Sequence, residues 1–195
     1  IFGSRGLGDV YKRQDIREDL ANKYNECISK SDVVISSGGA SDGVEDHTQN
    51  ALKDIGAKCI VWQLAMKPGK PMSIGLLGKK IIFCLPGNPV AAFVCTKLLI
   101  KPLIIKLAGG VNLNPLSMKL PSGFTHNKKT GRAEYLRAKI INENAKSFIT
   151  IHGRKGAGVI SSLTGADGIV EIPMEYKSVV KGELLNFFPF DHRGL

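Results

Sequence analysis

Three carboxylates stand in a glycine-rich stretch near the start of the chain. The stretch SSGGASDGVEDH runs from Ser36 to His47 and contains Asp42, Glu45 and Asp46. Glycines permit a positive φ and a close approach of a ligand to the backbone, and N–H groups at a helix N-terminus bind anions. A carboxylate beside a phosphate cradle can hold Mg²⁺, which bridges acid and phosphate. The alternative, which the residues leave open, is that these acids only cap the following helix.

A second candidate anion site is the turn AMKPGKP, residues 65–71. It places Lys67 and Lys70 between prolines, which lack backbone donors, around Gly69, which lets the chain turn. A stiff turn holds its charges in place before an anion arrives. Two ordinary surface lysines on a solvated turn are the competing interpretation.

The stretch LPGNP, residues 85–89, predicts the start of a long helix that ends near Leu107. Asn88 stands where an N-cap belongs and Pro89 where the first helical residue belongs. In the functional interpretation, Gly87 and the capped helix end face a ligand. A plain helix start explains the same residues equally well.

The elements around these motifs predict an α/β domain. Helical spacing begins at Asp15, a strand at 33–35 leads into the glycine loop, and a helix through 51–55 closes at Gly56. Strands are expected at 59–62, 72–77 and 81–85, the last two as a hairpin-like pair. Strand, glycine loop and helix in succession favour a mostly parallel sheet in a three-layer domain, with ligands at the carboxyl ends of the strands.

After residue 110 the pattern changes to short strands separated by turn signals. Strands are expected at 132–141, 147–151, 168–172 and 183–188, which favours a small all-β barrel or sandwich, and VNLNPLSMKLPSG, residues 111–123, is expected to be a loop. GRAEYLRA (131–138) and GAGVISSLTGADG (156–168) are expected to be strands and turns of this domain. Four of their side chains are candidates for ligand contact, although structural roles are favoured: Arg132, Arg137, Ser161 and Ser162.

Composition argues against several classes of partner. The formal net charge is +10, but aromatic residues are only 7% and no nucleic-acid-binding signature is visible, so nucleic acid is not expected as the partner. No apolar run approaches the ~20 residues that span a bilayer, so no membrane partner is expected. The four cysteines show no CxxC spacing, which favours buried, reduced thiols and a cytoplasmic location. Four scattered histidines do not predict a zinc site.

The first residues differ from the rest. IFGSRGLGDVYKRQ, residues 1–14, shows neither clean periodicity nor the apolar core of a signal peptide. Its GLGDVYKRQ part is similar to translated sequencing adapter, so residues 1–14 are expected to be non-native. We expect the true protein to be longer at its N-terminus.

Taken in order, SGGASDGVED, AMKPGKP, LPGNP, GRAEYLRA and SSLTGADGIVEIP resemble the MoeA family of molybdopterin molybdotransferases, homologous to the E domain of gephyrin. The resemblance runs from about Asp15 to Phe190. It implies a molybdopterin-binding α/β domain at 15–110, incomplete at its N-terminus, and the C-terminal β domain at 111–195. The family's other domains would lie upstream, which leaves the activity of this piece alone open.

The resemblance also implies a reaction and its partners. Family members insert molybdate into adenylylated molybdopterin and release molybdenum cofactor and AMP, with a divalent cation, typically Mg²⁺. They are homodimers with an active cleft shared between subunits. Molybdopterin adenylyltransferase and molybdoenzymes that accept the cofactor are the protein partners that follow from this reaction.

Site residues carry over by motif. Asp46 matches the acid that ends the family's glycine-loop pattern and is expected to be catalytic and metal-associated, with Glu45 as a second metal ligand. Lys67 and Lys70 match the lysines of the KPGK turn and would bind molybdate or phosphate. The remaining expected substrate-binding residues are Gly38, Gly39, Ser41, Gly43, Pro68, Gly69, Pro86, Gly87, Asn88 and Ser161. Asp42, Val44 and Gln63 depart from the family's usual residues.

Two other functions remain alternatives. Molybdopterin adenylyltransferase shares the α/β fold and an LPG-type turn, but it typically carries Arg-Asp-x-Thr where this chain has residues 45–48, EDHT. It also lacks the PGKP turn and the C-terminal β domain. The other alternative is a non-catalytic scaffold or pterin-binding piece, as in gephyrin.

Overall fold

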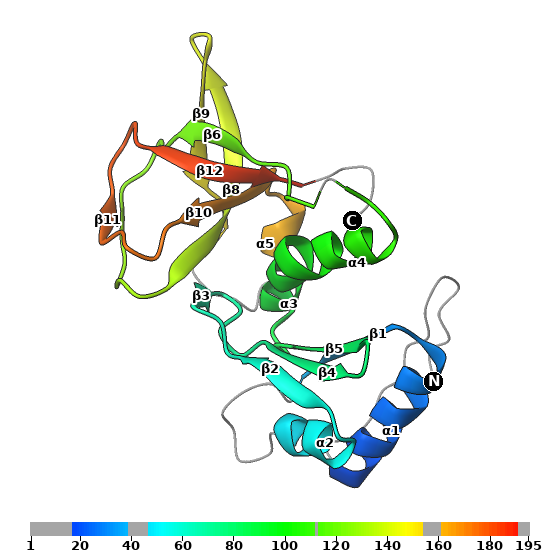
Figure 1. Cartoon of the computed structure of the whole chain (residues 1–195). Helices are drawn as coiled ribbons and strands as arrows, with labels where there is room; N and C mark the ends of the chain where they lie inside the picture. Colours follow the sequence, from blue (N-terminus) through cyan, green and yellow to red (C-terminus); the bar gives the residue numbers. More distant parts are fainter. Residues whose placement is uncertain (1–16, 39–46, 112, 154–160, 191–195) are drawn as a thin grey trace. The chain divides into compact units, whose positions relative to one another are not determined.

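The computed structural model describes residues 17–38, 47–111, 113–153 and 161–190, which fall into two compact units (Figure 1). The first unit takes in the chain up to Trp62 together with residues 71–85. The second comprises residues 63–70 and everything from Pro86 onward. The PGKP turn and the LPGNP helix start therefore both contribute to the second unit, whereas the glycine stretch begins in the first.

The first unit is a four-stranded sheet with two helices. Its elements are α1 (Arg17–Lys30), β1 (Val33–Ser37), α2 (Thr48–Asp54), β2 (Lys58–Trp62), β4 (Ser73–Leu77) and β5 (Lys80–Leu85). The strand order is β1-β5-β4-β2. The α/β class is confirmed, but the sheet is mixed: of these strand pairs β1–β5 is parallel, whereas β4–β5 and β2–β4 are antiparallel. A turn as short as the one at Gly78 can join only antiparallel strands.

The core of this unit lies between the sheet and its helices. Figure 1 shows α1 and α2 on the same side of the sheet. Helical spacing places Ala21, Tyr24 and Ile28 of α1 on one buried face. They pack with the alternate strand residues that point the same way, so the period predicted from Asp15 is confirmed from Arg17 onward. The remaining buried members of this cluster are Val34, Ala51, Leu52, Ala57, Ile82 and Cys84.

The helix predicted to end near Leu107 is present as one continuous helical run. It consists of α3 (Pro89–Cys95), a π-helical turn η1 (Thr96–Ile100) and α4 (Lys101–Leu107). Pro102 stands in the first turn of α4 and has no N–H to donate, so a straight ladder of α-helical bonds cannot pass this point. The wide turn η1 directly precedes it.

The second unit is otherwise built of strands. They are β3 (Met66–Lys67), β6 (Met118–Pro121), β7 (His126–Asn127), β8 (Ala133–Glu143), β9 (Lys146–Ile151), β10 (Gly168–Ile172), β11 (Ser178–Val179) and β12 (Leu184–Pro189), with one short helix, α5 (Ser161–Thr164). A six-stranded sheet has the order β3-β8-β10-β12-β6, with β9 paired to β8, and β7 pairs with β11. Its core includes Ile149, Val170 and Phe187.

Two predictions for this unit are wrong in detail. Residues 118–121, expected to be loop, form β6 and pair with β12. Within 156–168, expected to be strands and turns, residues 161–164 form α5. The first error arises because β6 is short and owes its conformation to a partner far along the chain.

The cysteines differ from one another in exposure. All four are free thiols; Cys84 and Cys95 are buried, whereas Cys59 is exposed, contrary to the expectation of uniform burial. Burial raises the pKa of the Cys95 thiol to about 12, which makes it unreactive at neutral pH. Among the helices of the described residues, none has the length and apolar character needed to span a membrane.

Candidate functional site

The glycine stretch leaves the first sheet at the carboxyl end of β1. Gly38 follows β1 with φ +91°, a left-handed conformation that glycine adopts without strain. Its N–H donates to the Leu85 carbonyl at 3.2 Å, which continues the parallel pairing with β5. That N–H is therefore engaged with protein. The other predicted residues of this stretch lie outside the described residues: Gly39, Ser41, Gly43, Glu45 and Asp46.

The helix after the glycine stretch, α2, begins at Thr48, directly after His47. The N-cap of α2 is His47, whose side chain makes no capping hydrogen bond, and the first turn of the helix contains no acid. Asp46 precedes this position in the sequence. His47 itself has helical dihedrals (φ −86°, ψ −2°), and Asp46 lies outside the described residues, so helix capping remains the alternative to a metal-binding role for Asp46.

The PGKP turn is closely held in the second unit. The Leu64 N–H donates to the Lys70 carbonyl at 2.8 Å and closes the turn, and the Lys67–Pro68 peptide bond is cis. Gly69 has φ +117°, and a Cβ added there would lie 2.8 Å from the Cys95 sulfur of α3. The turn therefore requires glycine for both its conformation and its packing.

Both lysines of this turn are exposed, which suits an anion-binding role. Lys67 closes the two-residue strand β3, which pairs in parallel with β8: Met66 lies opposite Ala133, and Lys67 opposite Glu134. The Ala133 N–H donates to the Ala65 carbonyl at 2.9 Å and extends this pairing. The turn is in this way tied to the longest strand of the β domain.

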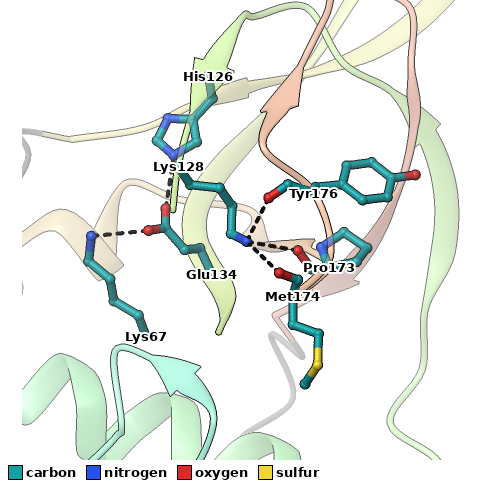
Figure 2. A network of polar contacts seen from close by, with 7 residues as sticks. All are labelled: Lys67, His126, Lys128, Glu134, Pro173, Met174 and Tyr176. Carbon is teal, nitrogen blue, oxygen red and sulfur yellow. Dashed lines mark hydrogen bonds and ion pairs between the residues drawn. The ribbon is translucent and has the colours of Figure 1, made fainter. Parts of the chain in front are cut away.

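Glu134 lies between two basic side chains, as Figure 2 shows. Lys67 Nζ donates to one carboxylate oxygen at 3.1 Å, and His126 Nε2 lies 2.8 Å from the other. The Glu134 side chain is 9% exposed and that of Lys67 is 60% exposed. A buried carboxylate needs partners for both oxygens, and here each oxygen has one.

The charge state of Glu134 follows from these contacts. Burial by itself raises the pKa of the Glu134 carboxyl, but the hydrogen bonds from His126 and Lys67 outweigh it, so the net pKa lies below its ordinary value of 4.5. The carboxylate is thus ionised at neutral pH. It presents a fixed negative charge to the Lys67 ammonium.

Lys128, two residues after His126, binds backbone carbonyls of a neighbouring turn. Figure 2 shows its ammonium group among three of them. The distances from Nζ are 2.9 Å to Pro173 O, 3.3 Å to Met174 O and 3.1 Å to Tyr176 O. An ammonium has three donors, and the geometry matches one to each carbonyl. This lysine fastens the turn that precedes β11.

Asn88 caps α3 as the sequence predicts. Its side-chain oxygen accepts hydrogen bonds from the N–H groups of Val90 at 3.0 Å and Ala91 at 3.2 Å, and Pro89 occupies the first turn. The oxygen is thus engaged by the helix, and the amide NH₂ is the part of this side chain suited to a ligand. Of its neighbours, Pro86 is buried and Gly87 exposed.

The arginines and serines proposed as ligand contacts differ in exposure. Arg132 is exposed, whereas Arg137 is buried, and burial lowers the pKa of its guanidinium. Ser162 is buried within α5. Ser161 begins α5, and its side chain lies outside the described residues. Arg132 is therefore the one of the two arginines that is accessible to solvent.

The described residues contain no group of three or more His, Cys, Asp or Glu side chains that would hold a metal ion. The two acids predicted as metal ligands, Glu45 and Asp46, are not among them. The metal prediction therefore rests on sequence alone.

Sequence reasoning missed Glu134 and His126. Glu134 is a buried acid in β8, and the strand residues that alternate with it on the same face are mostly apolar. An acid at such a position is unusual, and this is the signal that could have identified it. Its partner Lys67 could not be identified in that way, because it meets Glu134 through the pairing of β3 with β8, two segments far apart in the sequence. His126 lies eight residues before Glu134 and outside β8, so the alternation within that strand gives no signal for it.

Two sequence families match the chain in succession. The family described as "Probable molybdopterin binding domain" matches residues 9–106, and the "MoeA C-terminal region (domain IV)" matches residues 119–190. The order agrees with the order of the motifs.

Similar proteins carry related names. A "Molybdopterin molybdenumtransferase" of Haemophilus influenzae is 33% identical over 91% of this chain and 44% of its own length. The "Molybdenum cofactor synthesis protein cinnamon" of Drosophila melanogaster is 34% identical over 86% of this chain and 27% of its own length. The chain thus spans less than half the length of these relatives.

A solved structure supports the same assignment. The molybdopterin biosynthesis MoeA protein of Pyrococcus horikoshii aligns with a TM-score of 0.70 and 28% identity, covering 90% of this chain and 41% of that one. The resemblance predicted from the motifs is confirmed. The chain belongs to the molybdopterin-binding domain family, and in it that domain is followed by the C-terminal region of MoeA proteins.

Proposed function

We propose that the protein containing this chain is a molybdopterin molybdotransferase. It takes adenylylated molybdopterin and molybdate, cleaves the link between the molybdopterin phosphate and AMP, and releases molybdenum cofactor and AMP. The observation that carries the proposal is the succession of a molybdopterin-binding domain and a MoeA C-terminal region in one chain. Adenylyltransferases, the nearest alternative, lack the second domain.

The exposed lysines of the PGKP turn supply the anion-binding chemistry. Lys67 and Lys70 project from a turn held by a backbone hydrogen bond and by the close packing of Gly69. Molybdate and the pyrophosphate link are both anionic, and ammonium groups fixed in advance bind such groups with little loss of conformational entropy. Pro68, Pro86, Gly87, Asn88 and Ser161 are proposed to line the substrate site.

The glycine stretch is proposed to hold the phosphates, with Gly38, Gly39, Ser41 and Gly43 as its binding residues. Asp46, with Glu45, is proposed to hold Mg²⁺, which when bound neutralises the charge of the departing AMP. We also propose that the protein is a homodimer in the cytoplasm. Its proposed protein partners are a molybdopterin adenylyltransferase and the molybdoenzymes that accept the cofactor.

The test uses the complete gene product that contains this chain. Purified protein is mixed with adenylylated molybdopterin, molybdate and Mg²⁺, and AMP is measured by chromatography. Asp46→Ala is expected to abolish AMP release while leaving the melting temperature nearly unchanged. A large loss of stability in this variant would instead support a helix-capping role for Asp46.

The alternatives give different results in the same assay. An adenylyltransferase would consume ATP and molybdopterin and produce the adenylylated form. A scaffold would bind the pterin and release no AMP. Either result, with folded protein, would overturn the proposed reaction.

A further inference from the structure

We propose that Glu134 is a positioning residue that orients the Lys67 ammonium toward a bound anion, and that His126 holds Glu134 in place from its other oxygen. The contacts come from the structure alone. The identity of the anion, molybdate, rests on the proposed function.

Glu134 is the fixed member of the pair. It belongs to β8, which has β3 on one side, β10 on the other and β9 along its later residues. Its side chain is buried, and its second oxygen is engaged by His126, whose own side chain is only 15% exposed. Lys67, by contrast, stands on a strand of two residues and is mostly exposed. The carboxylate therefore sets the direction of the lysine, and the lysine does not set that of the carboxylate.

One contact leaves most of the ammonium group available. An ammonium has three N–H donors, and the Glu134 contact at 3.1 Å uses one. The remaining donors belong to a head group on a largely exposed side chain. A lone lysine at the surface samples many rotamers, and holding it in one of them lowers the entropy lost when an anion binds.

The pairing is not what a purely structural role would require. An ion pair with an exposed lysine adds little stability, whereas burying a carboxylate is costly. Glu171 on β10 shows the alternative within the same sheet: it accepts hydrogen bonds from Tyr135 Oη and Asn186 Nδ2, both at 2.8 Å, and neither donor is charged. Among these two acids, Glu134 alone is bonded to basic side chains.

A competing interpretation is that Glu134 is a latch that competes with the anion for Lys67. The two roles predict opposite effects of Glu134→Gln. Loss of a positioning residue weakens anion binding. Loss of a latch removes a competitor and a negative charge, and strengthens it.

The first experiment needs no ligand. The chain is treated with a trace of amine-acylating reagent, and the modification rates of Lys67 and Lys70 are compared by mass spectrometry. Glu134→Gln is expected to speed the acylation of Lys67 relative to Lys70 by about threefold, the scale of an exposed ion pair. Glu171→Gln is the matched control and leaves the ratio unchanged. An unchanged ratio in Glu134→Gln would show that the carboxylate does not hold the lysine.

The second experiment measures steady-state AMP release in the complete gene product. Glu134→Gln is expected to raise the KM for molybdate about tenfold, as for loss of a charge-assisted contact, with the KM for adenylylated molybdopterin unchanged. Glu134→Asp retains the charge and is expected to restore part of the affinity. It is the control for the case in which Glu134→Gln fails to fold. A lower molybdate KM in Glu134→Gln would overturn the positioning role in favour of the latch.

The two experiments separate this inference from the proposed function. If the unmodified protein releases no AMP, the proposed function fails and the anion role of Lys67 fails with it. The acylation ratio still decides whether Glu134 holds Lys67.

Discussion

At the scale of single residues, the site depends on a buried charge and on a glycine. Glu134 is ionised because its two basic neighbours outweigh the cost of its burial, and Gly69 allows the PGKP turn to pack against Cys95. Each effect can be measured by one substitution.

The lowered pKa of Glu134 predicts a pH-dependent contribution to stability. Because the folded-state pKa lies below 4.5, the unfolded chain takes up a proton first as the pH falls, and the contribution of the carboxylate is lost below that value. We expect Glu134→Gln to be less stable by about 1 kcal/mol at pH 6. The gap should narrow as the pH falls from 5 toward 3 in urea unfolding. A gap that stays constant or widens would contradict the assigned contacts.

Gly69→Ala should destabilise the turn in two ways. The left-handed φ costs about 1–2 kcal/mol for a residue with a Cβ, and the contact with the Cys95 sulfur adds overpacking of about 1–3 kcal/mol. Gly78→Ala is the matched control, since Gly78 also has a positive φ but open space around its Cβ position. The free energy of unfolding should fall more in Gly69→Ala; equal losses would remove the packing explanation.

At the scale of elements, the position of a helix or turn depends on how its ends are satisfied. Asn88 fixes the start of the run from Pro89 to Leu107, and Lys128 fixes the turn at 173–176. The first is a local contact that sequence predicts, and the second joins distant segments.

Asn88→Ala should remove the cap of α3 and lower the free energy of unfolding by about 1 kcal/mol. Asn88→Asp retains an acceptor for the Val90 and Ala91 N–H groups and should restore most of the loss. The measurement is chemical denaturation of the three proteins. Equal stability of Asn88→Ala and the unmodified chain would mean that the cap contributes nothing.

Lys128→Met should loosen the turn at 173–176, because three carbonyls lose a charged donor, at a cost of about 1–3 kcal/mol. The expected result is faster amide hydrogen exchange in residues 173–180, which include β11. Lys129→Met at the exposed neighbouring position is the control and should leave exchange unchanged. Unchanged exchange in Lys128→Met would contradict the fastening role.

The parts of the fold that sequence predicted are those with local causes. The period of α1, the hairpin at Gly78 and the cap at Asn88 each follow from neighbours within a few residues. β6 and the contact of Glu134 with Lys67 depend on strand pairing between distant segments, which periodicity does not encode. The sequence therefore predicted the motifs of the site, but it did not predict that Glu134 and His126 stand behind Lys67.

At the scale of the whole molecule, the chain combines a molybdopterin-binding domain with a MoeA C-terminal region and spans less than half the length of its named relatives. The PGKP turn is tied to the second of these by strand pairing between Lys67 and Glu134. The position of Lys67 accordingly depends on the β domain as well as on the turn itself.

The most direct test of the central claim is the molybdate dependence of AMP release. The complete gene product is given a fixed amount of adenylylated molybdopterin, and AMP is followed over time at increasing molybdate with Mg²⁺ present. The account predicts release that saturates with molybdate and is accompanied by molybdenum cofactor. Folded protein that releases no AMP above background at any molybdate concentration would contradict it.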